Sequence, residues 1–307
     1  MDAPRIHPLS FDPARLRGLS ARLVESHHRN NYAGAVRRLG AIRAELAALD
    51  WTAAPAFRVN GLKREELIAA NSMTLHELYF ASLGGDGVLQ PAGATAGLAV
   101  GIARDFGSIE RWRAEFAALG AALAGGSGWA LMSWSARESR LVIHWASDHG
   151  HLLAGATPIL ALDMYEHAYH LDFGADARSY ITAFMGNVDW AAVAARYAAA
   201  VEVSTAALAA TVARVEADRA TKRVDVRRRG AFEAAPDMIA GAVWRDPERV
   251  DEWAGEFAGS DVVVYCVHGH EVGRSTVARL REAGVNARFL AGGIEAWKMA
   301  GLPTQPR

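Results

Sequence analysis

The chain has 307 residues, which exceeds the usual size of one hydrophobic core and predicts two domains. Hydrophobic residues make up 51% of it and charged residues 22%, a composition that favours a folded protein over a disordered one. The 33 Lys and Arg residues nearly balance the 34 Asp and Glu residues, so the overall charge gives no reason to expect nucleic acid or an anionic membrane as a partner.

The amino terminus, MDAPRIHPLSFDPARL, lacks the basic start and apolar core of a secretory signal. No later apolar stretch reaches the ~18 uncharged residues that a membrane span needs. We therefore expect a soluble, cytoplasmic protein. The single cysteine, Cys266, excludes an intrachain disulfide and any metal site built from several cysteines.

The first part of the chain is predicted to be helical. Apolar residues recur at steps of three and four from about residue 19 to 49, and a second helix is predicted over 64–83, ending at the breaker Gly84-Gly85-Asp86-Gly87. Ser108 is expected to cap a later helix. Further helices are predicted over three segments: 92–103, 108–119 and 121 onward.

Between residues 129 and 162 the pattern changes to short aromatic and β-branched runs. These runs predict a small, mostly antiparallel sheet behind a helical layer, with strands over 129–134, 140–145 and 157–162. Helices are predicted again over 175–185 and 190–200.

A second domain is predicted after residue 200. The alanine-rich segment Val201–Lys222 predicts a helix capped by Ser204 that opens this domain; a rigid helical spacer is the alternative. Beyond it, the strand-like runs RVDVR, SDVVVYC and ARFL alternate with the helix-like runs PERVDEWAGEF, GRSTVARLREAG and GIEAWKMAG, which predicts a compact parallel α/β domain. The expected division is residues 1–200 and 201–307.

Three histidines and one carboxylate in the first domain form a candidate metal site. His27, His76 and His167 lie on predicted helices, and Asp163 ends a predicted strand four residues before His167. Taken singly, each histidine is more often a core or surface residue than a ligand. Together the four supply three imidazole nitrogens and one carboxylate, which suits Fe or Mn, although zinc remains chemically open.

Residues 8–200 resemble the iron/manganese superoxide dismutase family. The family motif D-x-W-E-H-A-Y stands here as DMYEHAY at 163–169, and GSGW at 126–129 and NVDW at 187–190 also match. The resemblance implies an α+β fold, in which a helical hairpin precedes a mixed α/β half with a small antiparallel sheet. It also implies one Fe or Mn ion per chain, dismutation of superoxide to oxygen and hydrogen peroxide, and the ligands His27, His76, Asp163 and His167.

The same resemblance implies roles for residues around the metal. Trp129 would wall the metal pocket, and Glu166 would reach across a dimer interface to the ligand histidine of the other subunit, which implies a homodimer through the N-terminal domain. Some family members place a histidine on the sheet that bonds to the metal-bound solvent. His149 is our candidate for that role, with His151 as a second; an exposed turn histidine is an equal alternative for either.

Several positions depart from the family pattern. Aligning His27 puts Ala35 where the family usually has a gateway tyrosine, Asn31 in place of a histidine, and Ser72 in place of the glutamine of iron enzymes. Tyr165 replaces the usual pocket tryptophan and His170 the usual interface tyrosine. The positions of Asn31 and His170 pair across the dimer in the family. We therefore hypothesise that an Asn31–His170 contact replaces the usual one.

The buried run 262–265 delivers Cys266 to the carboxyl end of a predicted strand, where α/β sheets place ligand sites. The turn that follows leads into a helix, so backbone N–H groups and a helix N-terminus would face the sulfur and stabilise an anion. A buried structural cysteine is the less favoured alternative.

Residues 204–307 resemble a single rhodanese domain. The matching segments are DVR at 225–227, IAGA at 239–242, VYC at 264–266, LAGGIEAWK at 290–298 and AGLP at 300–303. The resemblance implies that Cys266 attacks a sulfane sulfur donor, carries a persulfide and passes it to a thiol or cyanide-like acceptor.

By the same resemblance, the backbone amides of one loop cradle the persulfide. Two histidines and an acid stand in this loop in place of arginine or lysine, which weakens its attraction for thiosulfate-like anions. The two histidines either tune the charge of the thiolate or are exposed loop residues. The expected loop consists of Val267, His268, Gly269, His270, Glu271 and Val272.

The leading hypothesis is therefore a superoxide dismutase-like enzyme fused to a rhodanese-like sulfurtransferase. Its partners would be superoxide, a sulfane sulfur donor and a thiol acceptor. One alternative makes the first domain a non-dismutating dimeric scaffold or sensor that carries the rhodanese. Another makes it a metal-dependent oxygenase or sulfur-oxidising enzyme, which needs open coordination positions for its substrate.

Overall fold

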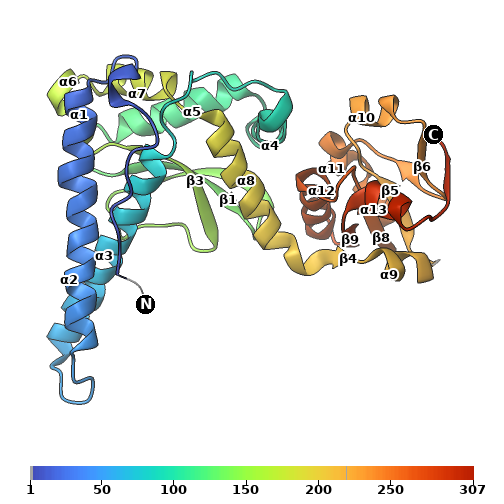
Figure 1. Cartoon of the computed structure of the whole chain (residues 1–307), viewed down its shortest axis with the longest axis horizontal. Coiled ribbons are helices and arrows are strands. Elements are labelled where there is room, and N and C mark those ends of the chain that lie inside the picture. Colours follow the sequence, from blue (N-terminus) through green and yellow to red (C-terminus); the bar gives the residue numbers. More distant parts are fainter. Residues whose placement is uncertain (1–2, 219) are drawn as a thin grey trace.

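Two lobes of different architecture follow one another along the chain, and helix α8 (Trp190–Thr205) leads from the first to the second (Figure 1). The computed structural model describes residues 3–218 and 220–307. Residues 1 and 2, in the segment expected to lack a secretory signal, lie outside the described residues. So does Arg219, in the helix expected over 201–222.

A long helical hairpin begins the N-terminal lobe. After the 3₁₀ turn η1 (Pro13–Arg15), its first arm comprises α1 (Ala21–Ser26), η2 (His27–Tyr32) and α2 (Ala33–Ala47), and its second arm is α3 (Ala56–Phe80). The two arms pack side by side (Figure 1). The helix predicted over 19–49 thus contains one unpredicted feature, because η2 is π-helical; such π segments frequently occur at functional sites.

Shorter helices follow the hairpin. They are η3 (Gly93–Thr95), α4 (Ala96–Phe106) and α5 (Ile109–Ala122). The predicted cap is confirmed, since the Ser108 hydroxyl accepts a hydrogen bond from the Arg111 N–H at 3.1 Å. The prediction of a helix from 121 onward is wrong, because α5 ends at Ala122 and a turn leads directly into the sheet.

The expected antiparallel sheet is confirmed. It consists of β1 (Trp129–Ser135), β2 (Arg140–Ala146) and β3 (Ala156–Asp163) in the order β2-β1-β3. Every residue of β1 is buried, as befits a central strand covered on both faces. Its register places Trp129 opposite Asp163, so the first residue of one strand lies beside the last residue of its neighbour.

The segment after Asp163 is tighter than predicted. His167 lies in the single 3₁₀ turn η4 (Glu166–Ala168), and the α-helix expected to carry it does not form there. The short α6 (His170–Phe173) and α7 (Ala177–Gly186) then complete the lobe together with α8.

The predicted helix over Val201–Lys222 with Ser204 as its N-cap is wrong. Helix α8 continues without a break to Thr205, past the expected division at residues 200 and 201. The Ser204 hydroxyl lies inside α8, where it accepts from Trp134 Nε1 at 3.1 Å and donates to the Val201 carbonyl at 3.0 Å. After it come η5 (Ala206–Leu208), β4 (Ala209–Ala210) and α9 (Val212–Ala217), the last capped by Thr211.

Within the part of the chain that the structure describes, one stretch, Trp190–Leu208, is long and apolar enough to cross a membrane by length and composition alone. One face of α8 is already occupied in the fold. Its buried side chains include Trp190, Val193, Tyr197 and Val201, and all four belong to the core of the N-terminal lobe.

The C-terminal lobe is the parallel α/β unit that the alternating pattern predicted. Its sheet has the order β4-β9-β8-β5-β7, with every neighbouring pair parallel. A separate antiparallel pair joins β6 to β10. The remaining elements are β5 (Lys222–Asp225), α10 (Arg229–Ala234), β6 (Asp237–Ile239), β7 (Val243–Trp244), η6 (Pro247–Arg249), α11 (Val250–Trp253), η7 (Ala254–Phe257), β8 (Asp261–Tyr265), α12 (Glu271–Glu282), β9 (Asn286–Leu290), α13 (Gly293–Met299) and β10 (Thr304–Pro306).

Candidate functional site

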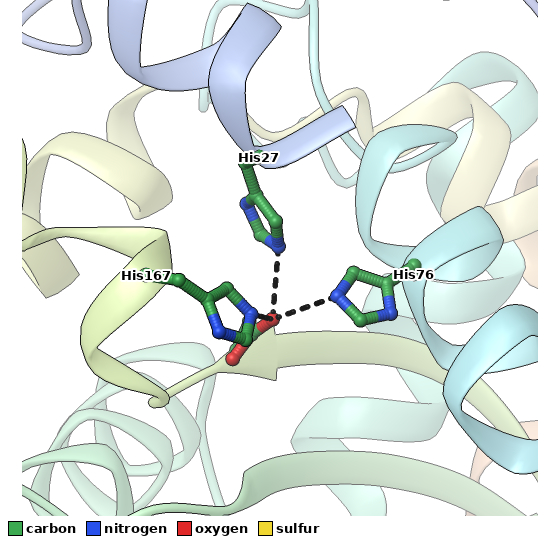
Figure 2. Close-up of side chains that lie close together, drawn as sticks. His27, His76 and His167 are labelled. Carbon is green, nitrogen blue, oxygen red and sulfur yellow. Dashed lines mark hydrogen bonds and ion pairs between the residues drawn. The ribbon is translucent and has the colours of Figure 1, made fainter. Parts of the chain in front are cut away.

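Four side chains from four separate segments converge between the helical hairpin and the end of β3 (Figure 2). The Asp163 Oδ2 atom lies 3.1 Å from His27 Nε2, 3.2 Å from His167 Nε2 and 3.5 Å from His76 Nε2. One ligand atom from each residue falls within 4.8 Å of every other. His27, His76 and Asp163 are buried, and His167 is half-buried. The structure therefore brings together all four residues that the sequence selected.

The local backbone explains how Asp163 presents one oxygen to the histidines. Its Oδ1 accepts a hydrogen bond from the Tyr165 N–H at 2.9 Å, which fixes the carboxylate plane and leaves Oδ2 facing the cluster. Tyr180 donates its hydroxyl to the Asp163 carbonyl at 2.7 Å and holds the strand end from the other side. The tight turn after β3 then returns His167 to the same point.

The tautomer of His76 follows from its hydrogen bonds. Its Nδ1 lies 2.7 Å from the Ser72 carbonyl, which can only accept, so Nδ1 carries the proton and Nε2 carries a lone pair. This Nε2 is buried and has no hydrogen-bond partner among the described residues. A lone pair that faces a carboxylate oxygen at 3.5 Å is repulsive unless a cation lies between the two atoms.

The protonation states of the cluster also suit a cation. Burial, reinforced by the neighbouring His27, lowers the pKa of His76 to about 3, and burial likewise lowers the pKa of His27. Burial opposes ionisation of Asp163, but its hydrogen bonds with His167 and His27 keep the pKa of that carboxyl below its usual value. The site therefore offers neutral imidazole nitrogens and a carboxylate, the ligand states that metal binding requires.

The donor set thus fits an Fe or Mn ion, since both metals accept imidazole together with carboxylate. Three nitrogens and one oxygen from the protein are fewer donors than an octahedral ion takes, so positions remain for solvent or a small substrate. The four residues form a candidate site for one Fe or Mn ion per chain.

Three aromatic side chains border the cluster on its sheet side. Trp129 Nε1 donates to His149 Nδ1 at 2.9 Å, so the proton of a neutral His149 is on Nε2. The Tyr165 ring stacks between His149 and His167, with centroid distances of 4.9 and 5.3 Å. Burial lowers the pKa of His149 and raises the pKa of Tyr165 to about 12.

The two candidate outer histidines occupy different places. His149 packs with its ring centroid 6.1 Å from that of His76, and its carbonyl accepts from Asn71 Nδ2 at 2.6 Å, which ties the loop to α3. His151 is exposed and turns toward Ser147, whose hydroxyl lies 2.7 Å from His151 Nδ1. His149 therefore lies beside the cluster, whereas His151 is directed away from it.

The remaining residues singled out by the sequence lie farther out. Asn31 is half-buried in η2, whereas Glu166 is exposed at the start of η4 and His170 is exposed at the start of α6. The contact between Asn31 and His170 of another subunit stays a prediction, as does the reach of Glu166 across an interface. Ala35 is buried in α2, and the Ser72 hydroxyl lies 3.4 Å from His76 Nδ1.

Sequence reasoning missed three aromatic residues that enclose the ligands. Tyr79 and Phe80 each pack at 5.0 Å from the ring of His27, and the Tyr79 hydroxyl lies 3.3 Å from that of Tyr180. For Tyr79 and Phe80 the signal was present, because positions three and four residues after His76 share its face of the helix.

Cys266 is buried at the carboxyl end of β8, and α12 begins five residues later at Glu271. The intervening turn is held close to the start of α13, since Ile294 N–H donates to the Cys266 carbonyl at 3.0 Å. Gly269 has a φ of +72°, and a Cβ there would lie 2.6 Å from the Leu290 carbonyl oxygen. Only glycine fits this close approach.

The loop side chains point mostly outward. His268 and His270 are exposed, as one of the two alternatives expected, and His268 Nδ1 lies 3.2 Å from a carboxylate oxygen of Glu295. Glu271 is half-buried and pairs with Arg228 at 3.0 Å. The acid of the loop is therefore already neutralised by a neighbouring arginine.

Comparisons with known proteins match the two lobes separately. Residues 94–196 match the family model "Iron/manganese superoxide dismutases, C-terminal domain", and residues 209–300 match the "Rhodanese-like domain" model. A superoxide dismutase [Fe] of Cupriavidus metallidurans is 61% identical over 194 residues, which cover 63% of this chain and 96% of the relative. A superoxide dismutase [Mn] of Haloferax volcanii is 36% identical over 60% of this chain and 90% of its own length. A superoxide dismutase [Fe] of Aquifex aeolicus is 31% identical over 64% of this chain and 93% of its own length.

Proposed function

The chain belongs to the iron/manganese superoxide dismutase family, and from this premise we propose that the N-terminal lobe, which α8 completes, is a metal-dependent superoxide dismutase and that the C-terminal lobe is a rhodanese-type sulfurtransferase. The observation that carries the first assignment is the unpartnered Nε2 lone pair of His76, which faces Asp163 among two further histidines. The second assignment rests on the position of Cys266 between β8 and α12.

In this proposal His27, His76, Asp163 and His167 are the metal ligands. An Fe or Mn ion held by them would supply one-electron chemistry, alternating between two oxidation states as one superoxide is oxidised and the next reduced. The overall reaction consumes two superoxide anions and two protons and releases one O₂ and one H₂O₂. The Ser72 carbonyl holds His76 in the tautomer that ligation requires.

Proton supply falls to the residues on the sheet side of the cluster. The indole of Trp129 keeps the proton of His149 on Nε2, so His149 can donate to solvent or peroxide in the site. Tyr165 stacks on both His149 and His167 and restricts the orientation of each ring. Its phenol is protonated at neutral pH, and burial, which raises its pKa to about 12, strengthens that preference.

The dismutase assignment is tested with metal-loaded full-length protein. We expect about one Fe or Mn per chain by elemental analysis and superoxide consumption well above the spontaneous rate. His149→Ala should lower the rate by about 10- to 100-fold, the usual cost of losing an outer-sphere partner, with metal content retained. His151→Ala is the matched control, since its ring turns away from the cluster, and should leave the rate unchanged.

Protein that holds its metal but consumes no superoxide would reject the dismutase and support the scaffold or sensor alternative. Oxygen uptake upon addition of a persulfide would instead favour a sulfur-oxidising enzyme. Equal losses in His149→Ala and His151→Ala would reject the role given to His149.

In the second domain Cys266 is the proposed nucleophile. Its thiolate attacks the terminal sulfur of a donor R–S–SH; a new S–S bond forms to Cys266, the donor S–S bond breaks, and R–S⁻ leaves. An acceptor thiolate R′–S⁻ then attacks the outer sulfur of Cys266–S–SH, which yields R′–S–SH and restores the Cys266 thiolate. The amides of residues 267–272 would hold the persulfide anion.

Replacing Cys266 by serine tests this mechanism. Because the chain has one cysteine, wild-type protein treated with a low-molecular-weight persulfide should gain the mass of one sulfur atom and pass it to a thiol. Cys266→Ser should gain no sulfur and lose all turnover. Sulfur transfer by Cys266→Ser at the wild-type rate would reject the assigned nucleophile.

Assembly and location complete the proposal. We propose a cytoplasmic homodimer formed through the N-terminal domain, with Glu166 and His170 at the interface. Support comes from the exposure of both side chains on the described chain, at the edge of the turn that carries His167.

A further inference from the structure

Arg274 on α12 joins the cysteine loop to the N-terminal lobe. Its Nε donates to the Gly269 carbonyl at 3.2 Å, its Nη1 to the Glu202 carbonyl at 3.2 Å, and its Nη2 lies 3.2 Å from the Glu202 carboxylate. The guanidinium also lies over the Phe289 ring, 4.4 Å from the centroid. One side chain therefore contacts the cysteine loop, the core of its own lobe and the last turn of α8.

The contact with α8 uses the Glu202 carbonyl, which also lies 3.5 Å from the Thr205 hydroxyl in the last turn of the helix. The last four carbonyls of a helix lack main-chain partners within it, and Glu202 is the fourth residue from the end of α8, three before Thr205. The partial negative charge at a helix C-terminus also attracts a cation. Because the side chain of Glu202 is 61% exposed and that of Arg274 only 14%, the carboxylate adds little, and the carbonyl is the more important anchor.

The contact with Gly269 fixes the direction of a loop amide. In a planar trans peptide the C=O and the following N–H point in opposite directions. Holding the Gly269 carbonyl against Arg274 therefore turns the His270 N–H away from Arg274. This N–H is one of the amides that the proposed persulfide site uses.

A second contact between the lobes involves the same loop. Glu271 lies against Gly97 of α4, where an added Cβ would overlap the carboxylate. The same carboxylate pairs with Arg228 of the C-terminal lobe. Figure 1 shows α12 on the side of the C-terminal lobe that faces α8 and α4, so the start of α12 rests against the other lobe.

We propose that Arg274 is a positioning residue that uses the last turn of α8 as a support to hold the Cys266 loop in its persulfide-binding conformation. The inference rests on the proposed sulfurtransferase function and adds that the N-terminal lobe controls that site. The loop would lose order whenever α8 and α12 separate.

The test measures loop order and catalysis in the full-length, metal-loaded chain. Hydrogen exchange of the amides of residues 268–272 should accelerate about tenfold or more in Arg274→Gln, since hydrogen bonds from a charged donor are lost. The kcat for sulfur transfer should fall with a smaller change in KM, because loop amides act on charge that develops in the transition state.

Two graded variants and one control sharpen this test. Arg274→Lys keeps the charge but cannot bond both carbonyls at once, so its effect should be intermediate, and it serves if Arg274→Gln does not fold. Glu202→Gln keeps the carbonyl and should have a small effect. Arg281→Gln is the control on the same helix, since Arg281 contacts Asn286 and Ala287 away from the loop.

The outcomes separate this inference from the proposed function. Unchanged exchange and unchanged kcat in both Arg274 variants would overturn the inference even if wild-type protein transfers sulfur. Faster exchange in those variants together with an inactive wild type would reject the sulfurtransferase and leave the positioning role intact.

Discussion

The Ser133 hydroxyl lies 2.8 Å from Nε2 of His144, and the two residues belong to the neighbouring strands β1 and β2. Burial lowers the pKa of His144 below its usual value of 6.5. Above pH 6.5 the ring is neutral in both the folded and the unfolded chain, so it does not affect stability. As the pH falls below 6.5, the unfolded chain takes up a proton that the folded chain resists, which favours unfolding.

His144→Gln should therefore lose less stability than wild type between pH 7.5 and pH 5. The measurement is the urea midpoint of the metal-loaded protein at both pH values. Ser133→Ala is the companion variant: it removes the hydrogen bond but keeps the buried imidazole, so its acid dependence should match wild type. A wild-type acid dependence in His144→Gln would contradict the assignment.

Single residues also mark the limit of prediction for the site. The four ligands could be predicted because Asp163 and His167 stand in a specific family motif, and the resemblance to that family also selects His27 and His76. The tautomer of His76 could not be predicted, since it depends on the Ser72 carbonyl one helical turn earlier. Nor could the choice between His149 and His151, because two turn histidines in one polar stretch differ only in how the loop folds.

At the scale of elements, α8 illustrates how helix signals act. Asp189 caps it by accepting from the N–H groups of Ala191 and Ala192 at 3.0 and 3.1 Å. Asp189→Ala should destabilise the N-terminal lobe by about 1 kcal/mol, equivalent to roughly 2–4 °C in Tm for a domain of this size. Calorimetry of the full chain measures this shift.

Glu115→Ala is the control for this prediction, because Glu115 is an exposed acidic residue in the middle of α5. Its Tm should lie within about 1 °C of wild type, as for most surface substitutions. An unchanged Tm in Asp189→Ala would mean that packing of Trp190 and its neighbours fixes the start of α8 without the cap.

The elements were predictable where pattern and cap agree, as at Ser108 and along the parallel strands. The end of α8 was not, because alanine-rich sequence runs across it and offers no local stop signal. Ser204 is a good N-cap by residue type, but its hydroxyl instead bonds to Trp134 of the sheet. The π-helical η2 was not predicted, because a segment of six residues is too short for a changed apolar spacing to show in the sequence.

At the scale of the whole molecule, the proposed dimer gives a prediction. Wild-type protein should be a dimer by light scattering. Glu166→Ala should raise its dissociation constant by at least about tenfold, since the proposed interface would lose a hydrogen bond made by a charged carboxylate. Glu138→Ala, on the exposed turn between β1 and β2, should leave the dimer intact.

A monomeric wild type would reject the dimer outright. A dimer that resists Glu166→Ala would place the interface elsewhere on the N-terminal lobe. Metal content should be recorded in the same samples, because the proposed contact reaches a ligand histidine of the other subunit.

The unbroken course of α8 fixes the rotation of one lobe against the other. Each residue of an α-helix advances the chain by about 1.5 Å and turns it by about 100°. One residue inserted after Glu202 in α8 would rotate the whole C-terminal lobe about the helix axis. Arg274 would then no longer reach the Glu202 carbonyl. The length of α8 therefore sets the orientation of the two lobes. Exchanging either lobe for that of a related protein should preserve their contact only when the number of residues in this helix is kept.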